Sequence, residues 1–407
     1  MVTGPPVQRR KRILGATCGA HFIHAGFSDL ITILLPVWQA EFSLTLSQVG
    51  IISSTYSGAM SIGQLPAGLA AERWGERRIL VVGTLLAGAG FCLLGFAGGA
   101  IGLALTLVLA GIGNSSQHPL SSTIVARAYE NGPMRAALGV YNFSGDLGKM
   151  AVPGLAALAL ASLDWSYVTY SYGGFGIIAA IGLLFFFRLL GVGAPLNDRP
   201  NPQNASLGKL KIHDWGIHQK SGFSILAALS MIDGACRAAF ITFLPFLLIS
   251  KGAGIEAVGA ALVLVFAGGA TGKLVCGMIA EHLGIVRTAI ISELATAGGI
   301  ILLLPLPLEA CYFLLPIVGV ALNGTSSVLY ASVAEFVTPE RHSRGFGLFM
   351  TLTMGAWAIA PAVFGVFSDL IGVALTMLVV SLFTLTTIPL ALGLSYPLRV
   401  ASHSRSK

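Results

Sequence analysis

The sequence predicts an all-α membrane protein, with twelve transmembrane helices in two pseudo-symmetric six-helix bundles. Hydrophobic residues make up 55% of the 407 residues and charged residues only 10%, against about a quarter in an ordinary soluble domain. A motif from the first half of the chain also returns in the second half. Because a spanning helix needs about 20 apolar residues and a short connection, the chain holds about a dozen helices. No room remains for a separate soluble catalytic domain.

In the first half, the apolar runs are separated by polar, glycine-rich or charged breaks. The first run follows four basic residues, Arg9 to Arg12, and is too long for the apolar part of a signal peptide. We therefore expect an uncleaved first span. The six expected helices of this half are 14–38, 47–70, 79–98, 100–127, 135–162 and 166–190.

In the second half, the breaks fall at Lys251, at the charged segment 281–286, at Pro307, at the basic segment 337–343 and near Asp369. The six expected helices between these breaks are 222–249, 256–280, 287–306, 309–336, 344–368 and 371–396. The many glycines and prolines in both halves are compatible with spanning helices, in which they are commoner than in soluble ones.

Basic residues lie almost entirely on one side of the expected membrane. If the N-terminus is cytoplasmic, the inner side carries 20 of the 24 Lys and Arg, the outer side one and the spans three. By the positive-inside rule, this predicts cytoplasmic N- and C-termini in a multi-pass protein of the cell inner (plasma) membrane. The net charge of +7 is thus a topology signal. Because the basic residues form no single patch, no nucleic-acid partner is expected.

An internal repeat divides the chain. The motif from Gly68 to Arg78 returns from Gly277 to Arg287, a shift of 209 residues. The same shift relates three further pairs of residues, namely Pro36 and Pro245, Asn114 and Asn323, and Arg135 and Arg344. The single long connection is rich in Pro, Asn and Lys. We therefore expect an N-terminal six-helix bundle at 1–190, a cytoplasmic linker at 191–221 and a C-terminal six-helix bundle at 222–407, with the substrate site near the bilayer midplane between the repeats.

The segment Gly68-Leu-Ala-Ala-Glu-Arg-Trp-Gly-Glu-Arg-Arg78 resembles the loop between helices two and three of the major facilitator superfamily. The resemblance implies the major facilitator fold and cytoplasmic ion pairs that stabilise the outward-open state. The alternative is that these charges only anchor the loop on the inner side. In the second copy, His282 and Val286 replace expected basic residues, which weakens the case for a second gate. Carried over by position, the gating motif comprises Gly68, Glu72, Arg73, Gly75, Arg77 and Arg78.

Within that superfamily, three segments resemble the fosmidomycin resistance proteins, which are proton-coupled drug exporters. They are His21-Phe22, the segment from Phe42 to Gly50, and the segment from Gly111 to Ser122 with its His-Pro-x-Ser-Ser sequence. This chain departs from the pattern at Leu120, where the family has Glu, and at Asp146 and Lys149, which interrupt the Gly-rich fifth helix of drug/proton antiporters. The resemblance implies export coupled to protons.

Seven ionisable residues other than histidine fall within the expected spans. Leaving each unpaired towards lipid would cost about 3 kcal/mol, or roughly 20 kcal/mol together. They should therefore face protein, water or one another. The seven are Asp29, Asp146, Lys149, Asp233, Arg237, Lys273 and Glu293.

Several of these residues share a helix face with other polar side chains. On the fifth expected helix, Asn142, Asp146 and Lys149 fall within one 100° sector, which is typical of a cavity wall. Asp233 and Arg237 are four residues apart and hence neighbours, either as a structural pair or as a binding site. His21, His24, Ser28 and Thr32 form a band on the first helix, and Asn114, Gln117, His118 and Ser121 form one on the fourth.

For the histidines, the alternative to ligand binding is a hydrogen bond between helices. For Lys273 and Glu293, nearer the cytoplasmic ends, snorkelling or a mutual structural pair is the favoured interpretation. We expect Asp29, Asp146 and Asp233 to be the proton-coupling residues, because carboxyl groups in a cavity can bind and release protons as it opens to each side. Lys149 and Arg237, from opposite halves, would clamp an anionic group such as a carboxylate or phosphonate. The expected substrate-binding residues are His24, His118, Tyr141, Asn142, Lys149, Arg237, Phe240, Asn323 and Trp357.

The sequence thus favours a proton-coupled exporter (antiporter) of a small organic compound or drug, anions included, working by rocking-bundle alternating access. The alternative is a proton- or sodium-coupled symporter that takes up an organic anion. More remote alternatives are a non-transporting membrane receptor and a polytopic membrane enzyme. The expected partners are a small-molecule substrate, H+ as coupling ion and membrane lipid, with the protein a monomer. The five cysteines lie singly in apolar segments and no nucleotide-binding loop is present, so no metal site or cofactor is expected. No enzyme activity is expected, because the charges are central in the spans and only the connection 191–221 is long.

Overall fold

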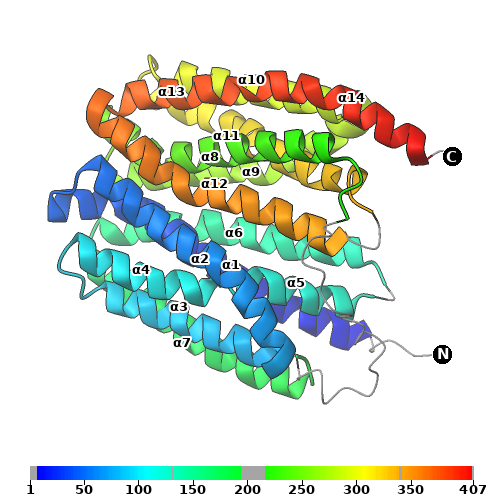
Figure 1. Ribbon diagram of the computed structural model, residues 1–407. Helices are drawn as coiled ribbons and strands as arrows, with labels where there is room; N and C mark the ends of the chain where they lie inside the picture. The colour runs from blue at the N-terminus through cyan, green and yellow to red at the C-terminus, as the bar shows by residue number, and fades with distance from the viewer. Residues whose placement is uncertain (1–6, 131, 194–215, 339–341, 406–407) are drawn as a thin grey trace. The chain divides into compact units, whose positions relative to one another are not determined.

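The computed structural model describes residues 7–130, 132–193, 216–338 and 342–405, and nearly all of them are helical (Figure 1). Most of the predicted linker lies outside the described residues. Within the described part, the extended pairing is limited to one isolated antiparallel bridge between Ile217 and Val337. The all-α prediction is confirmed.

Each expected span corresponds to one helix, or to two helices that meet at a break. The first half of the chain forms α1 (Val7–Phe42), α2 (Leu46–Trp74), α3 (Glu76–Leu94), α4 (Ala100–Asn114), α5 (Gln117–Ala128), α6 (Met134–Leu160) and α7 (Trp165–Leu189). The second half forms α8 (Lys220–Ser250), α9 (Ile255–Leu283), α10 (Ile285–Leu303), α11 (Leu308–Ser332), the short 3-10 helix η2 (Val333–Glu335), α12 (His342–Ile371), α13 (Val373–Leu385) and α14 (Thr387–Arg405).

Ten helical segments of the described residues are long and apolar enough to cross a membrane, with α4 and α5 counting as one segment and α13 and α14 as another. Helices α2 and α6 have sufficient length, 29 and 27 residues. Their sequences carry more polar residues, however, such as the serines of α2 and the charges of α6. The structure therefore gives a multi-pass membrane protein, and the count of twelve spans stays a prediction.

The internal repeat is visible in the helix boundaries. Moving α2 and α3 along the chain by 209 residues reproduces the first and last residues of α9 and α10. Gly75 and Gly284, which separate the helices of each pair, have φ angles of 85° and 80°. This left-handed backbone region is open to glycine without strain, which explains why the motif has glycine at both positions.

The helices form two compact units, and each is described here by itself. Unit 1 comprises Met1–Leu44, Thr55–Ala205 and Ile255–Val263. In it α1 packs against α6 and α5, and α3 packs against α4 and α7. Its buried core includes Leu80, Val125, Tyr141 and Phe187.

Unit 2 comprises Thr45–Ser54, Ser206–Gly254 and Leu264–Lys407. Helix α8 packs against α12, α13 and α14, while α10 packs against α11 and α13. The core of this unit includes Phe223, Leu329, Phe336 and Phe349.

The first turn of α2 belongs to unit 2, where the end of α12 holds it. The Asp369 carboxylate accepts hydrogen bonds from the backbone N–H groups of Leu46 and Ser47, both at 2.8 Å, and from the Ser47 hydroxyl. A carboxylate in this position satisfies free N–H groups of the helix start and complements the helix dipole. One turn on, a Cβ atom at Gly50 would lie 2.0 Å from the Pro361 carbonyl oxygen, so glycine is required there.

Candidate functional site

A break between α4 and α5 places the polar residues of unit 1. Pro119 has no N–H to donate to the carbonyl of Ser115, which interrupts the helix between Asn114 and Gln117. The sequence predicted one continuous span here, and the structure divides it. In transporters, discontinuous helices commonly mark the binding region.

A hydrogen-bond network around Asn114 links four helices at this break. Its side-chain oxygen bonds His24 Nδ1, and its Nδ2 donates to the Tyr56 hydroxyl at 2.6 Å and to Ser28 Oγ at 3.0 Å. On its other side, His24 Nε2 lies 2.8 Å from Thr84 Oγ1 of α3. Because the Asn114 oxygen can only accept, His24 carries a proton on Nδ1. His24 and Asn114 are both buried, so the expectation of a hydrogen bond between helices holds for His24.

A second group of predicted residues lies on the α5 side of the break. His21 Nδ1 lies 2.8 Å from the Tyr141 carbonyl oxygen, and its ring stacks on Tyr141 at 4.3 Å between centroids. The exposed His118 ring meets His21 edge-on at 5.0 Å. The Tyr141 hydroxyl in turn donates to Gln117 Oε1 at 3.3 Å. Tyr141 and His118, both predicted to bind substrate, therefore meet around His21.

The predicted residues of α6 differ in exposure. Asp146 is buried, Lys149 is half-buried and close enough to His21 to affect it electrostatically, and Asn142 is exposed. On α1, the half-buried Asp29 acts electrostatically on Tyr56. The polar face predicted for the fifth span thus extends from the interior of unit 1 to its surface.

The predicted gating motif is mostly exposed. Glu72, Arg73 and Arg78 lie on the surface, with the Arg73 guanidinium 5.7 Å from the centre of the Trp74 ring. Arg77 is half-buried, and its backbone N–H donates to the Gly193 carbonyl oxygen at 3.1 Å. Gly68, at the end of α2, has open space around it.

The motif also contains an ion pair that the sequence analysis did not single out. The Glu76 carboxylate, which is 5% exposed, lies 2.6 Å from the Arg127 guanidinium at the end of α5. Glu76 is the first residue of α3, where the helix dipole favours a negative charge. The position of Glu76 directly after Gly75, at the start of a helix, was the sequence feature that could have identified it. Its partner is 51 residues away and could be identified only in the folded structure.

In unit 2, the predicted neighbours Asp233 and Arg237 form an ion pair on α8. The Arg237 guanidinium also lies 5.7 Å from the centre of the Trp357 ring on α12, a cation–π geometry. Phe240 is fully buried. Asn323 is half-buried and donates to the Gly319 carbonyl oxygen of its own helix at 3.4 Å. Three of these predicted residues, Asp233, Arg237 and Trp357, are thus brought together.

Of the two interpretations favoured for Lys273 and Glu293, snorkelling is wrong for Glu293. Its side chain is only 1% exposed, and its carboxyl group lies beside that of Asp233. A helix-wheel argument could not identify this contact, because Asp233 and Glu293 lie on different helices, 60 residues apart.

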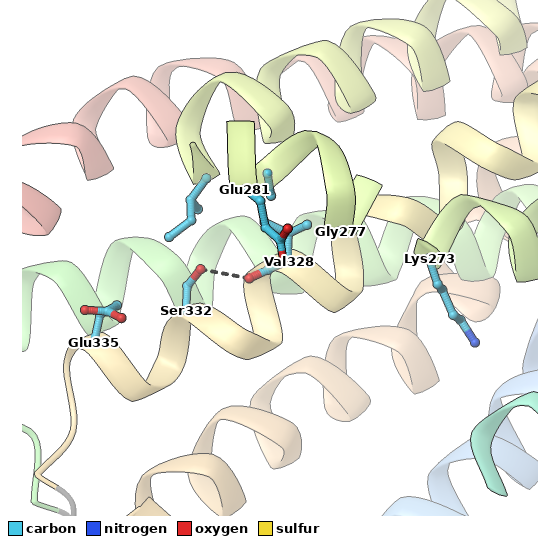
Figure 2. Close-up of a pocket in the computed structure, with 8 residues that line it drawn as sticks. Lys273, Gly277, Glu281, Val328, Ser332 and Glu335 are labelled. Atoms are coloured by element: carbon cyan, nitrogen blue, oxygen red, sulfur yellow. Dashed lines mark hydrogen bonds between the residues drawn. The ribbon is translucent and has the colours of Figure 1, made fainter. Parts of the chain in front are cut away.

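A cavity of about 400 Å³ opens in unit 2 between α9, α11 and η2 (Figure 2). Charged and small residues line it, and the Ser332 hydroxyl at its wall donates to the Val328 carbonyl oxygen at 2.8 Å. Gly277 and Glu281, from the second copy of the repeated motif, belong to the same wall. The cavity contains none of the predicted substrate-binding residues. Its lining is Lys273, Gly277, Ala280, Glu281, Ile285, Val328, Ser332 and Glu335.

Comparison with protein families gives the assignment of the chain. The model of the Major Facilitator Superfamily matches residues 17–229 and 223–407. The chain belongs to this superfamily. It is therefore a transporter-family protein of the membrane and not an enzyme, and the predicted fold class is confirmed.

Individual relatives agree with this assignment. The fosmidomycin resistance protein of Escherichia coli (strain K12) is 26% identical over 360 residues, which cover 88% of this chain and 86% of that protein. The probable sulfoacetate transporter SauU of Cupriavidus necator is 25% identical over 182 residues, 45% of this chain and 42% of that protein. The resemblance to the fosmidomycin resistance group is confirmed.

Among solved structures, a bacterial homologue of the human lysosomal transporter Spinster, in an inward-facing and unoccupied conformation, has the same fold. The TM-score is 0.79 at 15% sequence identity, with 98% of this chain and 99% of that chain covered. At this level of identity the likeness concerns the fold alone.

Proposed function

We propose that this superfamily member is a proton-coupled exporter, exchanging H+ for a small organic compound or drug by rocking-bundle alternating access. The observation that carries the proposal is the set of buried polar and charged side chains on membrane-spanning helices. Asn114, His24 and Asp233 are buried and Arg237 is half-buried on helices long and apolar enough to cross a membrane. Intramembrane residues of this kind usually serve a substrate or ion pathway.

An organic anion is the substrate class that we favour. Of the cations inside the expected spans we assign Lys149 and Arg237 to the anion, Lys as a point charge and Arg as a planar donor for carboxylate or phosphonate oxygens. The substrate-binding residues that we assign are the nine predicted from the sequence. The similarity to a probable transporter of sulfoacetate, an organic anion, supports this class.

We assign proton coupling to Asp29, Asp146 and Asp233. Replacing the critical aspartate by asparagine should abolish pH-driven transport while the protein still folds. If pH-driven transport is unchanged in all three single variants, the assignment fails. The similarity to the fosmidomycin resistance protein supports proton-coupled export, because the predicted motifs of that group are present at His21-Phe22 and 111–122.

Uptake of an organic anion with H+ or Na+ is the second candidate. The residues that would bind the anion are the same in both cases, and the direction follows from the ion gradient that is coupled. A receptor that binds without translocating would show no substrate-driven counterflow in liposomes. We place the protein in the cell inner membrane as a monomer with cytoplasmic termini, with bundles at 1–190 and 222–407 joined by the linker.

The decisive experiment uses purified protein in proteoliposomes under an imposed pH gradient, inside acid or inside alkaline. Phosphonates, carboxylates and amphiphilic drugs are tested in parallel, and empty liposomes serve as the control. Export by antiport predicts that a substrate loaded on one side moves against the proton flux. Movement of substrate with the protons, or only with a sodium gradient, would instead favour the symporter.

A further inference from the structure

Two buried carboxyl groups and a half-buried arginine lie together in unit 2. Asp233 and Arg237 come from α8 and Glu293 from α10. Glu293 is 1% exposed and Asp233 6%, so water reaches neither carboxyl group freely. The proposed function assigns proton coupling to three aspartates and does not include Glu293.

The contacts in this cluster are incomplete. Asp233 is ion-paired with Arg237, and its carboxyl group lies beside that of Glu293. Two buried polar atoms, Glu293 Oε1 and Arg237 Nε, make no hydrogen bond within the described residues. An unpaired buried polar atom is costly, so its presence on the most buried member of the cluster points to a ligand.

The charges of the cluster indicate that this ligand is a proton. A hydrogen bond between two carboxyl groups requires a proton on one of them, since an ionised carboxylate only accepts. Arginine stays protonated in proteins, so Arg237 neutralises one carboxylate. With one proton on the other carboxyl group the cluster is neutral. Without that proton it carries a buried charge of −1, which is strongly disfavoured.

Within the described part of the chain, the side chains named beside the cluster on α11, α12 and α13 carry no charge. Thr325 of α11 lies beside Glu293, Trp357 of α12 covers the Arg237 guanidinium, and Thr384 of α13 faces Cys236. Cys236 is the other titratable group nearby, and its thiol faces the Val380 carbonyl oxygen at 3.7 Å. The balance between neutral and negative states therefore rests on the two carboxyl groups.

We propose that Asp233 and Glu293 form a single proton-binding site, with Arg237 as its fixed counter-charge and Glu293 as the group that releases the proton. In the loaded state the Glu293 carboxyl O–H donates to the Asp233 carboxylate, which is ion-paired with Arg237. Release breaks the Glu293 O–H bond, leaves the electron pair on the carboxylate and passes H+ to water. The site rests on the proposed function, because it supplies a carrier for the coupled proton.

Infrared difference spectroscopy of the purified full-length protein tests the proposal without a known substrate. Between two pH values on either side of the titration, the wild type should lose the C=O stretch of about one protonated carboxyl group per protein. Glu293→Gln should lack this signal, because its amide donates to Asp233 in place of the carboxyl O–H. Asp233→Asn should also lack it, because Arg237 then pairs with the remaining Glu293 carboxylate.

Glu281→Gln is the matched control, since Glu281 is an exposed glutamate on α9, and its titration signal should equal that of the wild type. Glu293→Asp keeps an ionisable group, so the signal should persist with a shifted midpoint. An undiminished signal in Glu293→Gln would overturn the proposal. So would an undiminished signal in Asp233→Asn, because the two carboxyl groups would then not share the proton.

The liposome assay separates this proposal from the proposed function. If the infrared titration behaves as expected and no compound is moved by a pH gradient, the proton site stands and the exporter function fails. If pH-driven transport is found and the signal does not depend on Glu293, the exporter function stands and the shared proton site is wrong.

Discussion

Asn114 has the most varied contacts of the predicted residues in unit 1. Its amide oxygen accepts from His24 and its amide nitrogen donates to Tyr56 and Ser28, so one short side chain joins α1, α2 and α4. Removing it leaves the buried His24 Nδ1 without its partner, which costs about 1–3 kcal/mol, while the Tyr56 and Ser28 hydroxyls still bond each other.

We therefore expect Asn114→Ala to lower stability by about 1–3 kcal/mol. The measurement is the thermal unfolding midpoint of the purified protein in detergent. Thr106→Val is the control, because the Thr106 hydroxyl on the same helix bonds only to carbonyl oxygens of its own helix, at 2.8 and 3.0 Å. Equal midpoints for both variants would contradict the central role of Asn114.

Arg127 provides a second prediction at this scale. Arg127→Ala leaves the buried Glu76 carboxylate without its guanidinium, and because Arg127 is itself 46% exposed we expect a loss of about 1–2 kcal/mol rather than that of a fully buried pair. Arg73→Ala, in the same motif but exposed, should change stability by less than about 0.5 kcal/mol. Thermal unfolding checks both, and an equally large effect of Arg73→Ala would argue against the pair.

The sequence was sufficient to identify candidate functional residues. It was a poorer guide to which of these residues contact one another. The excess of charge within apolar runs singled out Asp233, Arg237 and Glu293, because each is costly in lipid. Asp233 and Arg237 were paired correctly, since four residues is one helical turn. Glu293 was misinterpreted, because its partner depends on how α8 and α10 pack, and the periodicity of one helix carries no information on that.

At the scale of elements, glycine determines how closely helices of unit 1 approach. On α6, a Cβ atom at Gly148 would lie 2.2 Å from the Phe22 carbonyl oxygen of α1, and the obstacle is backbone that cannot rotate away. Gly139 on the same helix has no atom within 4 Å of such a Cβ. Small residues at helix interfaces permit this approach in membranes.

Gly148→Ala should consequently destabilise the protein by about 1–3 kcal/mol, the typical cost of overpacking. Gly139→Ala should be neutral or stabilise it by up to about 1 kcal/mol, because alanine is the better helix former. Unfolding midpoints in detergent give both values. A destabilising Gly139→Ala of the same size would mean that helix packing is not the cause.

Most helix boundaries were predictable, but the expected spans 100–127 and 371–396 are each divided into two α-helices. Charged and turn-rich segments end most helices within a few residues of the expected positions. The single span expected at 100–127 is instead broken between α4 and α5. Pro119 was visible in the sequence, but a proline near a serine pair in an apolar run is compatible with either a kink or a break.

For the whole molecule, composition and the 209-residue repeat predicted the fold class, because apolar length and repetition are properties of the chain alone. The repeat did not predict symmetry of function. Asn114 is the hub of a network in unit 1, whereas its counterpart Asn323 bonds only a carbonyl oxygen of its own helix among the bonds described. Backbone geometry is common to both copies, as Gly75 and Gly284 demonstrate, while the side-chain chemistry has diverged.

The last prediction concerns transport of an anion by the whole protein. Arg237→Lys keeps the positive charge beside Asp233 but loses the planar fork that binds two oxygens at once. We expect about a tenfold weaker apparent affinity for a carboxylate or phosphonate, equivalent to about 1.4 kcal/mol. Lys149→Ala should weaken it comparably, while Lys220→Ala, exposed at the start of α8, should have no effect. The proteoliposome assay gives the apparent affinities of the three variants. Arg237→Lys retains the counter-charge of the shared proton site, so its infrared titration signal should remain. Unchanged affinity in both Arg237→Lys and Lys149→Ala would remove the anion from the proposed substrate class.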